Sequence, residues 1–322
     1  MRAWKYSALT VLAVACGGTE STLDGGGTDA NSGNDVNSGN DTGAGNDTGT
    51  PNDSGMSTDG DSSSVVDSGP FTPSNLGSEL VLWLDAAKGI TLTPAVATWA
   101  DQSTYGNNGA GGTGMGAHQP TVNATAINSL PAVEFANTGN GASQYIEITD
   151  SASLQFGTSD FAVFMVAEYT NTTTGMTASQ ATFYWKVAGN TTPTGPQLYG
   201  NAGTGTTTLD AQVRARLTGT DNIDSAGTMY NDGKFHRVGI RRNGNALEVW
   251  SDGVSASFTP DAGGTFDVSA TGSDVFIGAQ PNGNNVEIRL QGAIAEVVGI
   301  NGTLSASDVT NLDGYFTTKY AL

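Results

Sequence analysis

Between Gly17 and Pro70 the chain carries no aromatic residue, no lysine and no arginine. Burying apolar surface stabilises a fold by about 25 cal/mol per Å², whereas fixing the backbone of one residue costs about 1–2 kcal/mol. A segment with so few large apolar side chains cannot offset that cost, so we predict that residues 16–70 form a disordered linker. The hydrophobic core must then form within residues 71–322, a length that suits one all-β domain.

An aspartate recurs at every sixth position of this linker, from Asp29 to Asp59. Calcium loops of the EF-hand type need closely alternating oxygen ligands and a glutamate further along, and the repeat offers neither. It also lacks the regular apolar position that would stack into a solenoid core. Its Asp, Asn, Gly, Ser and Thr residues favour turns and solvated coil, and its like charges repel one another. We therefore interpret the repeat as an extended tether.

The whole chain is acidic, with a formal net charge of −19. Phosphate backbones would repel such a chain, so we expect no nucleic-acid binding. The sequence "GAGGTG" (109–114) fits a dinucleotide-binding glycine pattern, but a polar turn precedes it and no helix pattern follows. Because that motif functions only between a strand and a helix, we expect no nucleotide.

The first fifteen residues have the pattern of a secretory signal peptide, with Arg2 and Lys5 before a short apolar run. The residues up to Cys16 resemble the lipobox of bacterial lipoproteins, with the leucine one place early, at Leu12. The resemblance implies that Cys16 is acylated, becomes the first mature residue and anchors the protein to a membrane. The alternative is an ordinary signal peptide that ends in an incidental cysteine.

An aspartate directly after the lipidated cysteine would resemble an inner-membrane retention signal, but this position holds Gly17. We therefore expect the outer membrane, and the sequence leaves open which side of it the domain faces. Cys16 is also the single cysteine of the chain. The mature domain is therefore expected to contain no disulfide, no thiol catalysis and no cysteine-ligated zinc.

From Leu80 onward, short apolar segments alternate with glycine-rich and asparagine-rich turns. "FAVFMVAEY" (161–169) is apolar at nearly every position, which predicts a central strand buried on both faces. Asn243-Gly244 and Asp252-Gly253 predict two tight hairpins within an antiparallel meander, 235–258. This pattern predicts an all-β fold, an antiparallel sandwich or jelly roll.

The C-terminal segment alone has a helical pattern. Ser305 is a predicted N-cap, with Asp308 three residues later in a capping box. Val309, Leu312 and Phe316 lie on one face, which we expect to pack on the sandwich.

Several segments resemble landmarks of bacterial laminin G-like jelly-roll domains, in the concanavalin A-like lectin/glucanase superfamily. They are "LVLWLDAAKGITL", "VATWADQSTYGNNG", "QPTVNATAINSLPAVEFA", "DGKFHRVGIRRNGNALEVWSDG" and the closing "LSASDVTNLDGYFTTKYAL". The resemblance covers about residues 78–322 and implies a jelly-roll fold. Domains of this superfamily include lectins, hydrolases, adhesion modules and structural modules, so the fold leaves the activity open.

The resemblance also implies a calcium ion at the rim of the domain. The candidate oxygen donors are Asp101, Asn107, Asn108, Asp221 and Asp224. The alternative is that these residues form turns and bond to their own backbone. For Asp101, structural hydrogen bonding is the favoured interpretation.

Aromatic side chains are the candidate ligand contacts, because sugar rings stack on exposed aromatic faces. The segment "TFYWK" (182–186) holds Tyr184 and Trp185, and Tyr199 follows in a glycine-rich and threonine-rich stretch. Regular alternation would place Tyr184 on one face and Trp185 on the other, together with Phe183. Burial on both faces is the alternative to a binding platform.

Catalytic patterns are weak. Retaining glycosidases need two closely spaced carboxyl groups, and each glutamate of the strand-like segments stands alone in its own segment. The sequence thus predicts a membrane-anchored, non-catalytic module of the cell envelope that binds glycan or protein. The alternatives are a structural or adhesive protein without a small-molecule ligand, and a glycan-active hydrolase or lyase.

Overall fold

The computed structural model describes residues 69–112, 119–136, 144–170, 180–188, 194–201, 211–218, 221–227, 230–259, 267–282, 285–287 and 289–322. Cys16 and the predicted linker before Gly69 lie outside these residues, so the predictions made for them stay predictions. No helix in the described part of the chain is long and apolar enough to cross a membrane.

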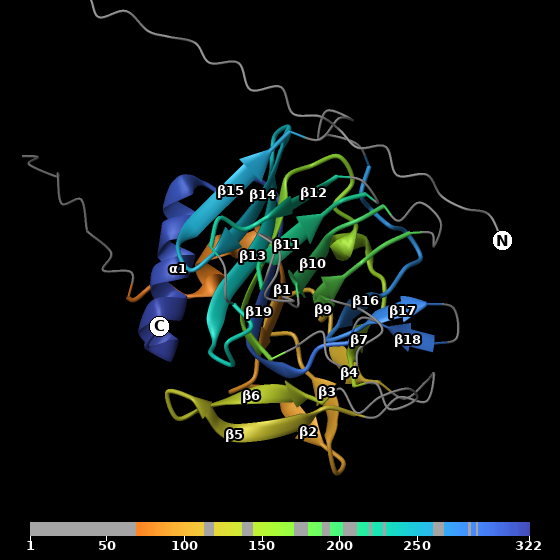
Figure 1. Cartoon of the computed structure of the whole chain (residues 1–322), viewed down its shortest axis with the longest axis vertical. Helices are drawn as coiled ribbons and strands as arrows, with labels where there is room; N and C mark the ends of the chain where they lie inside the picture. The colour runs from red at the N-terminus through yellow and green to blue at the C-terminus, as the bar shows by residue number, and fades with distance from the viewer. Residues whose placement is uncertain are drawn as a thin grey trace, which may run out of the picture. The chain divides into compact units, whose positions relative to one another are not determined.

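Two antiparallel sheets form a sandwich, with one long helix beside it (Figure 1). Sheet A runs in the order β15-β14-β13-β8-β19-β6-β5, and β1 also pairs with β19. Its strands are β1 (Leu80–Asp85), β5 (Thr121–Ile127), β6 (Leu130–Phe135), β8 (Phe161–Tyr169), β13 (His236–Asn243), β14 (Ala246–Ser251), β15 (Val254–Phe258) and β19 (Gly292–Asn301).

Sheet B runs in the order β12-β11-β10-β9-β16-β7-β4-β3-β2. Its strands are β2 (Ile90–Leu92), β3 (Val96–Trp99), β4 (Gly109–Gly111), β7 (Ile146–Ile148), β9 (Gln180–Trp185), β10 (Gln197–Asn201), β11 (Val213–Arg216), β12 (Asn222–Asp224) and β16 (Val275–Ile277). The other described elements are the hairpin β17 (Gln280–Asn282) and β18 (Asn285–Glu287), the 3-10 helices η1 (Pro73–Glu79) and η2 (Ala152–Leu154), and the helix α1 (Ala306–Tyr320).

Strand β8 explains how the sandwich and the helix share one core. Alternate residues such as Val163 and Met165 belong to the apolar cluster between the two sheets. The residues between them, such as Phe164 and Val166, belong to a second cluster that includes Leu312 of α1. Because both faces of β8 are covered, its sequence is apolar throughout, and the predicted central strand is confirmed between β13 and β19.

The predicted meander is present as β13, β14 and β15. The second turn is Asp252-Gly253, with positive φ at both residues, as a two-residue hairpin of this kind requires. In the first turn Asn243 already pairs with Ala246. The two central residues of this turn are therefore Gly244 and Asn245, one position later than the predicted pair, Asn243-Gly244.

Helix α1 begins at the predicted N-cap. The Ser305 side chain accepts a hydrogen bond from the Asp308 backbone, and the Asp308 carboxylate accepts one from the Ser305 backbone. The predicted apolar face, which includes Leu312 and Phe316, is buried against sheet A. The predicted all-β sandwich with a C-terminal helix is therefore confirmed.

Candidate functional site

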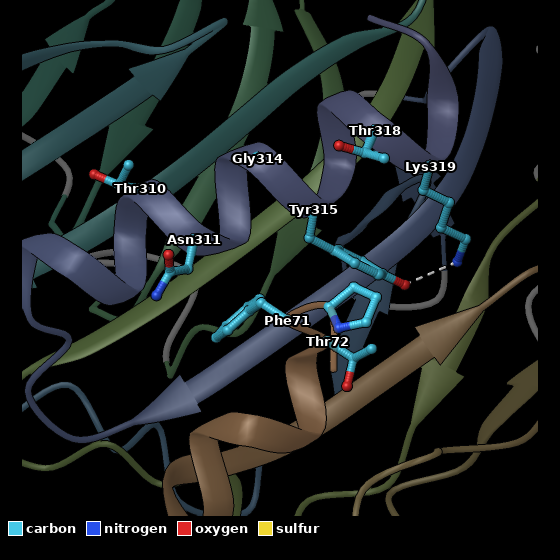
Figure 2. A pocket seen from close by; sticks show the side chains of 9 residues that line it. Phe71, Thr72, Thr310, Asn311, Gly314, Tyr315, Thr318 and Lys319 are labelled. Atoms are coloured by element: carbon cyan, nitrogen blue, oxygen red, sulfur yellow. Dashed lines mark hydrogen bonds between the residues drawn. The ribbon is translucent and has the colours of Figure 1, made fainter. Parts of the chain in front are cut away.

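A hollow of about 410 Å³ lies between α1 and the segment that leads into η1 (Figure 2). We call it the α1 pocket. Its lining residues are Pro70, Phe71, Thr72, Thr310, Asn311, Gly314, Tyr315, Thr318 and Lys319. They come from the first residues of the domain and from its last helix, so the pocket exists only because the fold brings the two ends of the domain together.

A buried carboxylate, Glu296 of β19, lies next to this pocket and is fully covered. Its Oε1 accepts hydrogen bonds from Trp83 Nε1 at 2.5 Å and from Tyr315 Oη at 2.9 Å. Its Oε2 accepts from Lys319 Nζ at 2.8 Å and from Tyr320 Oη at 2.7 Å. We call these five residues the Glu296 network. A buried charge is tolerable when it is bonded in this way, so the network fastens α1 to sheet A.

Beside the Glu296 network, Asp85 adds one negative charge, and Lys88, whose Nζ lies 3.7 Å from Asp85 Oδ2, adds one positive charge. Lys319 Nζ also lies 2.8 Å from Asp85 Oδ2 and forms an ion pair with it, although the angles do not meet those of a hydrogen bond. Burial raises the pKa of Glu296, Lys319 opposes that shift, and Asp85 adds to it. Burial, and next the Glu296 charge, raise the pKa of Tyr315, which therefore stays a neutral hydrogen-bond donor.

A second pocket, of about 340 Å³, lies over sheet A where β6, β19 and β8 are neighbours. Glu134 and Glu168 both line it, and both face Ala293 of the strand between them. Burial, and next the charge of Glu134, raise the pKa of Glu168. The sequence separated these glutamates by 34 residues, and only strand pairing brings them to one face.

The outer face of sheet B carries a small aromatic cluster. Its buried members are Tyr145, Trp185, Val187, Tyr199, Phe276 and Ala279. Trp185 and Tyr199 meet edge to face with ring centroids 6.0 Å apart, and the Arg216 guanidinium lies 5.7 Å from the centre of the Tyr199 ring. The Tyr199 hydroxyl donates to Gln197 Oε1 at 2.8 Å. The structure thus brings together two of the three predicted ligand contacts.

Tyr184, the third predicted ligand contact, is fully buried in the core between the sheets. The prediction that Phe183 shares a face with Trp185 is wrong, because Phe183 lies in the same core as Tyr184. The pairing of β9 with β10 shifts register between Leu198 and Tyr199, and such a bulge interrupts the alternation of side chains.

None of the predicted ligand contacts Tyr184, Trp185 and Tyr199 presents a ring face to solvent. The arrangement is burial on both faces rather than an exposed platform.

The calcium candidates Asp101, Asn107 and Asn108 lie in one turn and bond to protein groups. Asp101 accepts four hydrogen bonds, from the backbone of Trp83, the backbone and hydroxyl of Ser103, and the backbone of Asn107. Asn107 is buried and donates to the Val81 carbonyl, and Asn108 accepts from the Asp101 backbone. This is the turn-forming arrangement, in which the side-chain oxygens already have partners.

The other calcium candidates, Asp221 and Asp224, bond in different directions. Asp221 accepts from the Thr218 hydroxyl at 2.8 Å. Asp224 forms a two-point pair with Arg214, with Nε–Oδ1 at 2.7 Å and Nη2–Oδ2 at 2.8 Å, and also accepts from Asn201. Among the described residues no group of three or more His, Cys, Asp or Glu side chains is arranged to hold a metal ion.

His236 lies half-buried between two carboxylates. Its Nδ1 is 2.7 Å from Asp252 Oδ2, and its Nε2 is 3.1 Å from Asp232 Oδ1. Desolvation lowers the pKa of His236, but the hydrogen bonds to Asp252 and Asp232 outweigh it and raise the pKa overall. The next residue, Arg237, bonds to Asp313 and Thr317 on α1. This end of the meander therefore holds the helix in place.

The comparisons with known proteins agree with the fold. The family model of the laminin G domain matches residues 206–303. No curated protein matches the chain.

Solved structures of similar fold include toxin domains. Botulinum neurotoxin type C, which depends on interaction with two ganglioside molecules to enter cells, matches with a TM-score of 0.51 and 11% identity over 76% of this chain and 53% of its own. The binding domain of Paraclostridial Mosquitocidal Protein 1 matches with a TM-score of 0.50 and 13% identity over 75% of this chain and 53% of its own. The binding domain of botulinum neurotoxin DC, in complex with rat synaptotagmin II, matches with a TM-score of 0.50 and 12% identity over 74% of this chain and 52% of its own. This chain thus spans about half the length of those proteins, and the likeness concerns the fold.

Proposed function

We propose that this laminin G-like, concanavalin A-like domain is a non-catalytic module that binds glycan or protein ligands at the bacterial cell envelope. The observation that carries the proposal is the shared fold with binding domains. One of these belongs to a toxin that interacts with gangliosides, and another was captured with a protein ligand. The α1 pocket gives such a module a concave surface of the right size for a small ligand.

The proposed anchor is the lipid on Cys16, and the proposed location is the outer membrane, on either side of it. The acidic, aromatic-free sequence between Cys16 and the domain supports a tether that holds the module away from the membrane. Mass spectrometry of the mature N-terminus tests the anchor. An acylated Cys16 supports it, whereas a mature chain that starts at another residue, or at an unmodified Cys16, contradicts it.

Binding of the full chain to an array of glycans, in millimolar calcium and again with a chelator, tests the function. A ligand that binds in both conditions supports the module without a metal. A ligand that is lost with the chelator supports a calcium ion as well, and substitutions of Asp101 and Asp224 then distinguish the two candidate places. If neither the glycans nor envelope proteins bind, the structural or adhesive alternative replaces this proposal.

A second candidate function, glycan hydrolysis, is favoured by the pocket that Glu134 and Glu168 line. A general acid needs a carboxyl group with a raised pKa, and Glu168 has one. The two glutamates lie on strands separated by one other strand, and that separation suits an inverting rather than a retaining pair. Release of reducing sugar from neutral polysaccharides, lost in Glu134→Gln and in Glu168→Gln, would support this candidate. Absence of hydrolysis in the wild-type chain would remove it.

A further inference from the structure

The α1 pocket contains a glycine that the packing of the fold does not require. Gly314 lies in the middle of α1, where glycine costs about 1 kcal/mol relative to alanine. A Cβ built on Gly314 would meet no atom within 4 Å, so no neighbour needs the space. The same residue lines the pocket. The missing side chain keeps the pocket open at the expense of helix stability, which points to an occupant.

Two aromatic rings stand in the wall of the pocket. Phe71 comes from the segment before η1, and Tyr315 comes from α1, with its hydroxyl directed toward Lys319 (Figure 2). Both pack partly against the cluster under the helix. The Tyr315 hydroxyl donates to Glu296, which fixes the ring before any ligand arrives. Rigid aromatic rings of this kind offer apolar faces at a low entropic cost of binding.

The uncharged polar side chains of the pocket are an amide and hydroxyls. Asn311 and Thr318 are exposed, and no hydrogen bond of their side chains to other described residues is found. Asn311 can donate two hydrogen bonds and accept two, and Thr318 can donate one and accept two. Alternating donors and acceptors beside aromatic faces match a sugar ring, which has an apolar C–H face and a rim of hydroxyls.

The charge of the pocket favours a neutral ligand. Lys319, the cation in its wall, is already bonded to Glu296 and paired with Asp85. These two buried carboxylates leave the surroundings of Lys319 without excess positive charge. The chain as a whole carries −19. A phosphate, sulfate or carboxylate group would therefore enter against the field.

Two other kinds of ligand fit the pocket less well. An added peptide strand needs an open sheet edge, and this pocket is formed by a helix and the segment before a 3-10 helix. An acyl chain would leave Asn311 and Thr318 facing hydrocarbon, and burying polar groups without partners is unfavourable.

We infer that the α1 pocket is a binding site for a neutral saccharide, built from hexose or N-acetylhexosamine units, which stacks between Phe71 and Tyr315 and bonds to Asn311 and Thr318. This inference rests on the proposed function and names the ligand class and the place where the domain binds it.

The test uses the full chain on an array that carries neutral oligosaccharides together with sialylated and sulfated glycans, followed by calorimetry with the best soluble neutral saccharide. Asn311→Ala should weaken binding about tenfold, the loss expected for one hydrogen-bonding amide. Gly314→Trp should fill the pocket and remove binding, and Gly314→Ala should weaken it with the fold unchanged. The matched control is Ala306→Trp, on the same helix at an exposed position outside the pocket.

Several outcomes would overturn the inference. If a neutral glycan binds but Asn311→Ala, Gly314→Ala and Gly314→Trp all bind as tightly as the wild type, the ligand site is elsewhere and the proposed function stands. The same holds if the array binds through sialylated or sulfated glycans alone, or if the ligand is a protein. If neither glycans nor proteins bind, both the inference and the proposed function fail. Gly314→Ala keeps the test valid should the tryptophan variant not fold.

Discussion

The two edges of helix α1 are used differently. On the edge toward β13, Asp313 and Thr317 bond to Arg237, whose backbone donates to Asp252 at 2.9 Å. On the edge toward η1, Asn311 and Gly314 line the α1 pocket, and a Cβ on Gly314 would meet no neighbouring atom within 4 Å. Tyr315 and Lys319 on the second edge also hold the helix, through Glu296, but Asn311 and Gly314 beside them leave a polar group and space exposed. The exposed Asn311 side chain on this second edge is therefore free to bind a ligand.

The face of α1 that lies between these edges should be the most sensitive to substitution. Phe316 is buried there, together with Leu312 and Tyr320. Phe316→Ala should lower the free energy of unfolding by about 3–5 kcal/mol, because it leaves a cavity in the core. Urea denaturation measures the change, with the exposed residue Ser307 as the control position for Ser307→Ala. A loss below 1 kcal/mol would mean that α1 is not part of the cooperative core.

Substitution of Glu296 should have the second largest effect on stability. Glu296→Gln keeps the size of the side chain but can place its NH2 group opposite Lys319 Nζ and Tyr320 Oη, which are themselves donors. One buried donor then lacks a partner, and the free energy of unfolding should fall by about 1–3 kcal/mol. The control is Glu79→Gln, a partly exposed carboxylate outside the network. Equal thermal midpoints for the two variants would contradict the role assigned to the network.

His236, at the start of β13, should make the stability of the fold depend on pH. Its pKa is raised in the fold by Asp252 and Asp232, so the protonated form is favoured in the native state. The stabilisation is complete below the unfolded pKa of about 6.5 and is lost as the pH rises through the folded pKa. The thermal midpoint, measured from pH 5 to 9, should therefore fall as the pH rises above about 6.5 and through the folded pKa.

His236→Gln provides the control for this pH dependence, because glutamine does not titrate. Its midpoint should vary less over the same interval than that of the wild type. If the thermal midpoint of the wild type instead rises with pH over this interval, the carboxylates, and not His236, dominate the pH dependence of stability.

Gly314 should produce the smallest change, and in the opposite direction. Gly314→Ala adds a Cβ where no atom lies within 4 Å, so it should raise the free energy of unfolding by about 0.5–1 kcal/mol. Denaturation of the unliganded chain measures this gain. Destabilisation instead would mean that the pocket edge is packed, and it would remove the contrast between the two edges.

The sequence predicted the elements well, because local patterns define them. Alternation and apolar runs identified strands such as β8, and the Ser305–Asp308 capping box identified the start of α1. The aromatic segment 182–186 was harder, since the bulge at Phe183 depends on a register shift with β10 that no local pattern records. For the same reason, the sequence left two alternatives open for Tyr184 and Trp185, burial on both faces and an exposed platform, and only the structure decided for burial.

By itself, the sequence determined where a core can form, through the contrast between an aromatic-free stretch and a strand-rich body, and it determined the class of fold. Only the tertiary structure decided the candidate sites. Phe71 and Gly314 are separated by 243 positions, and Glu134 and Glu168 by 34, yet each pair lines one pocket. Alternation of polar and apolar side chains is a local property, whereas the meeting of distant residues depends on which strands pair and on where the last helix packs.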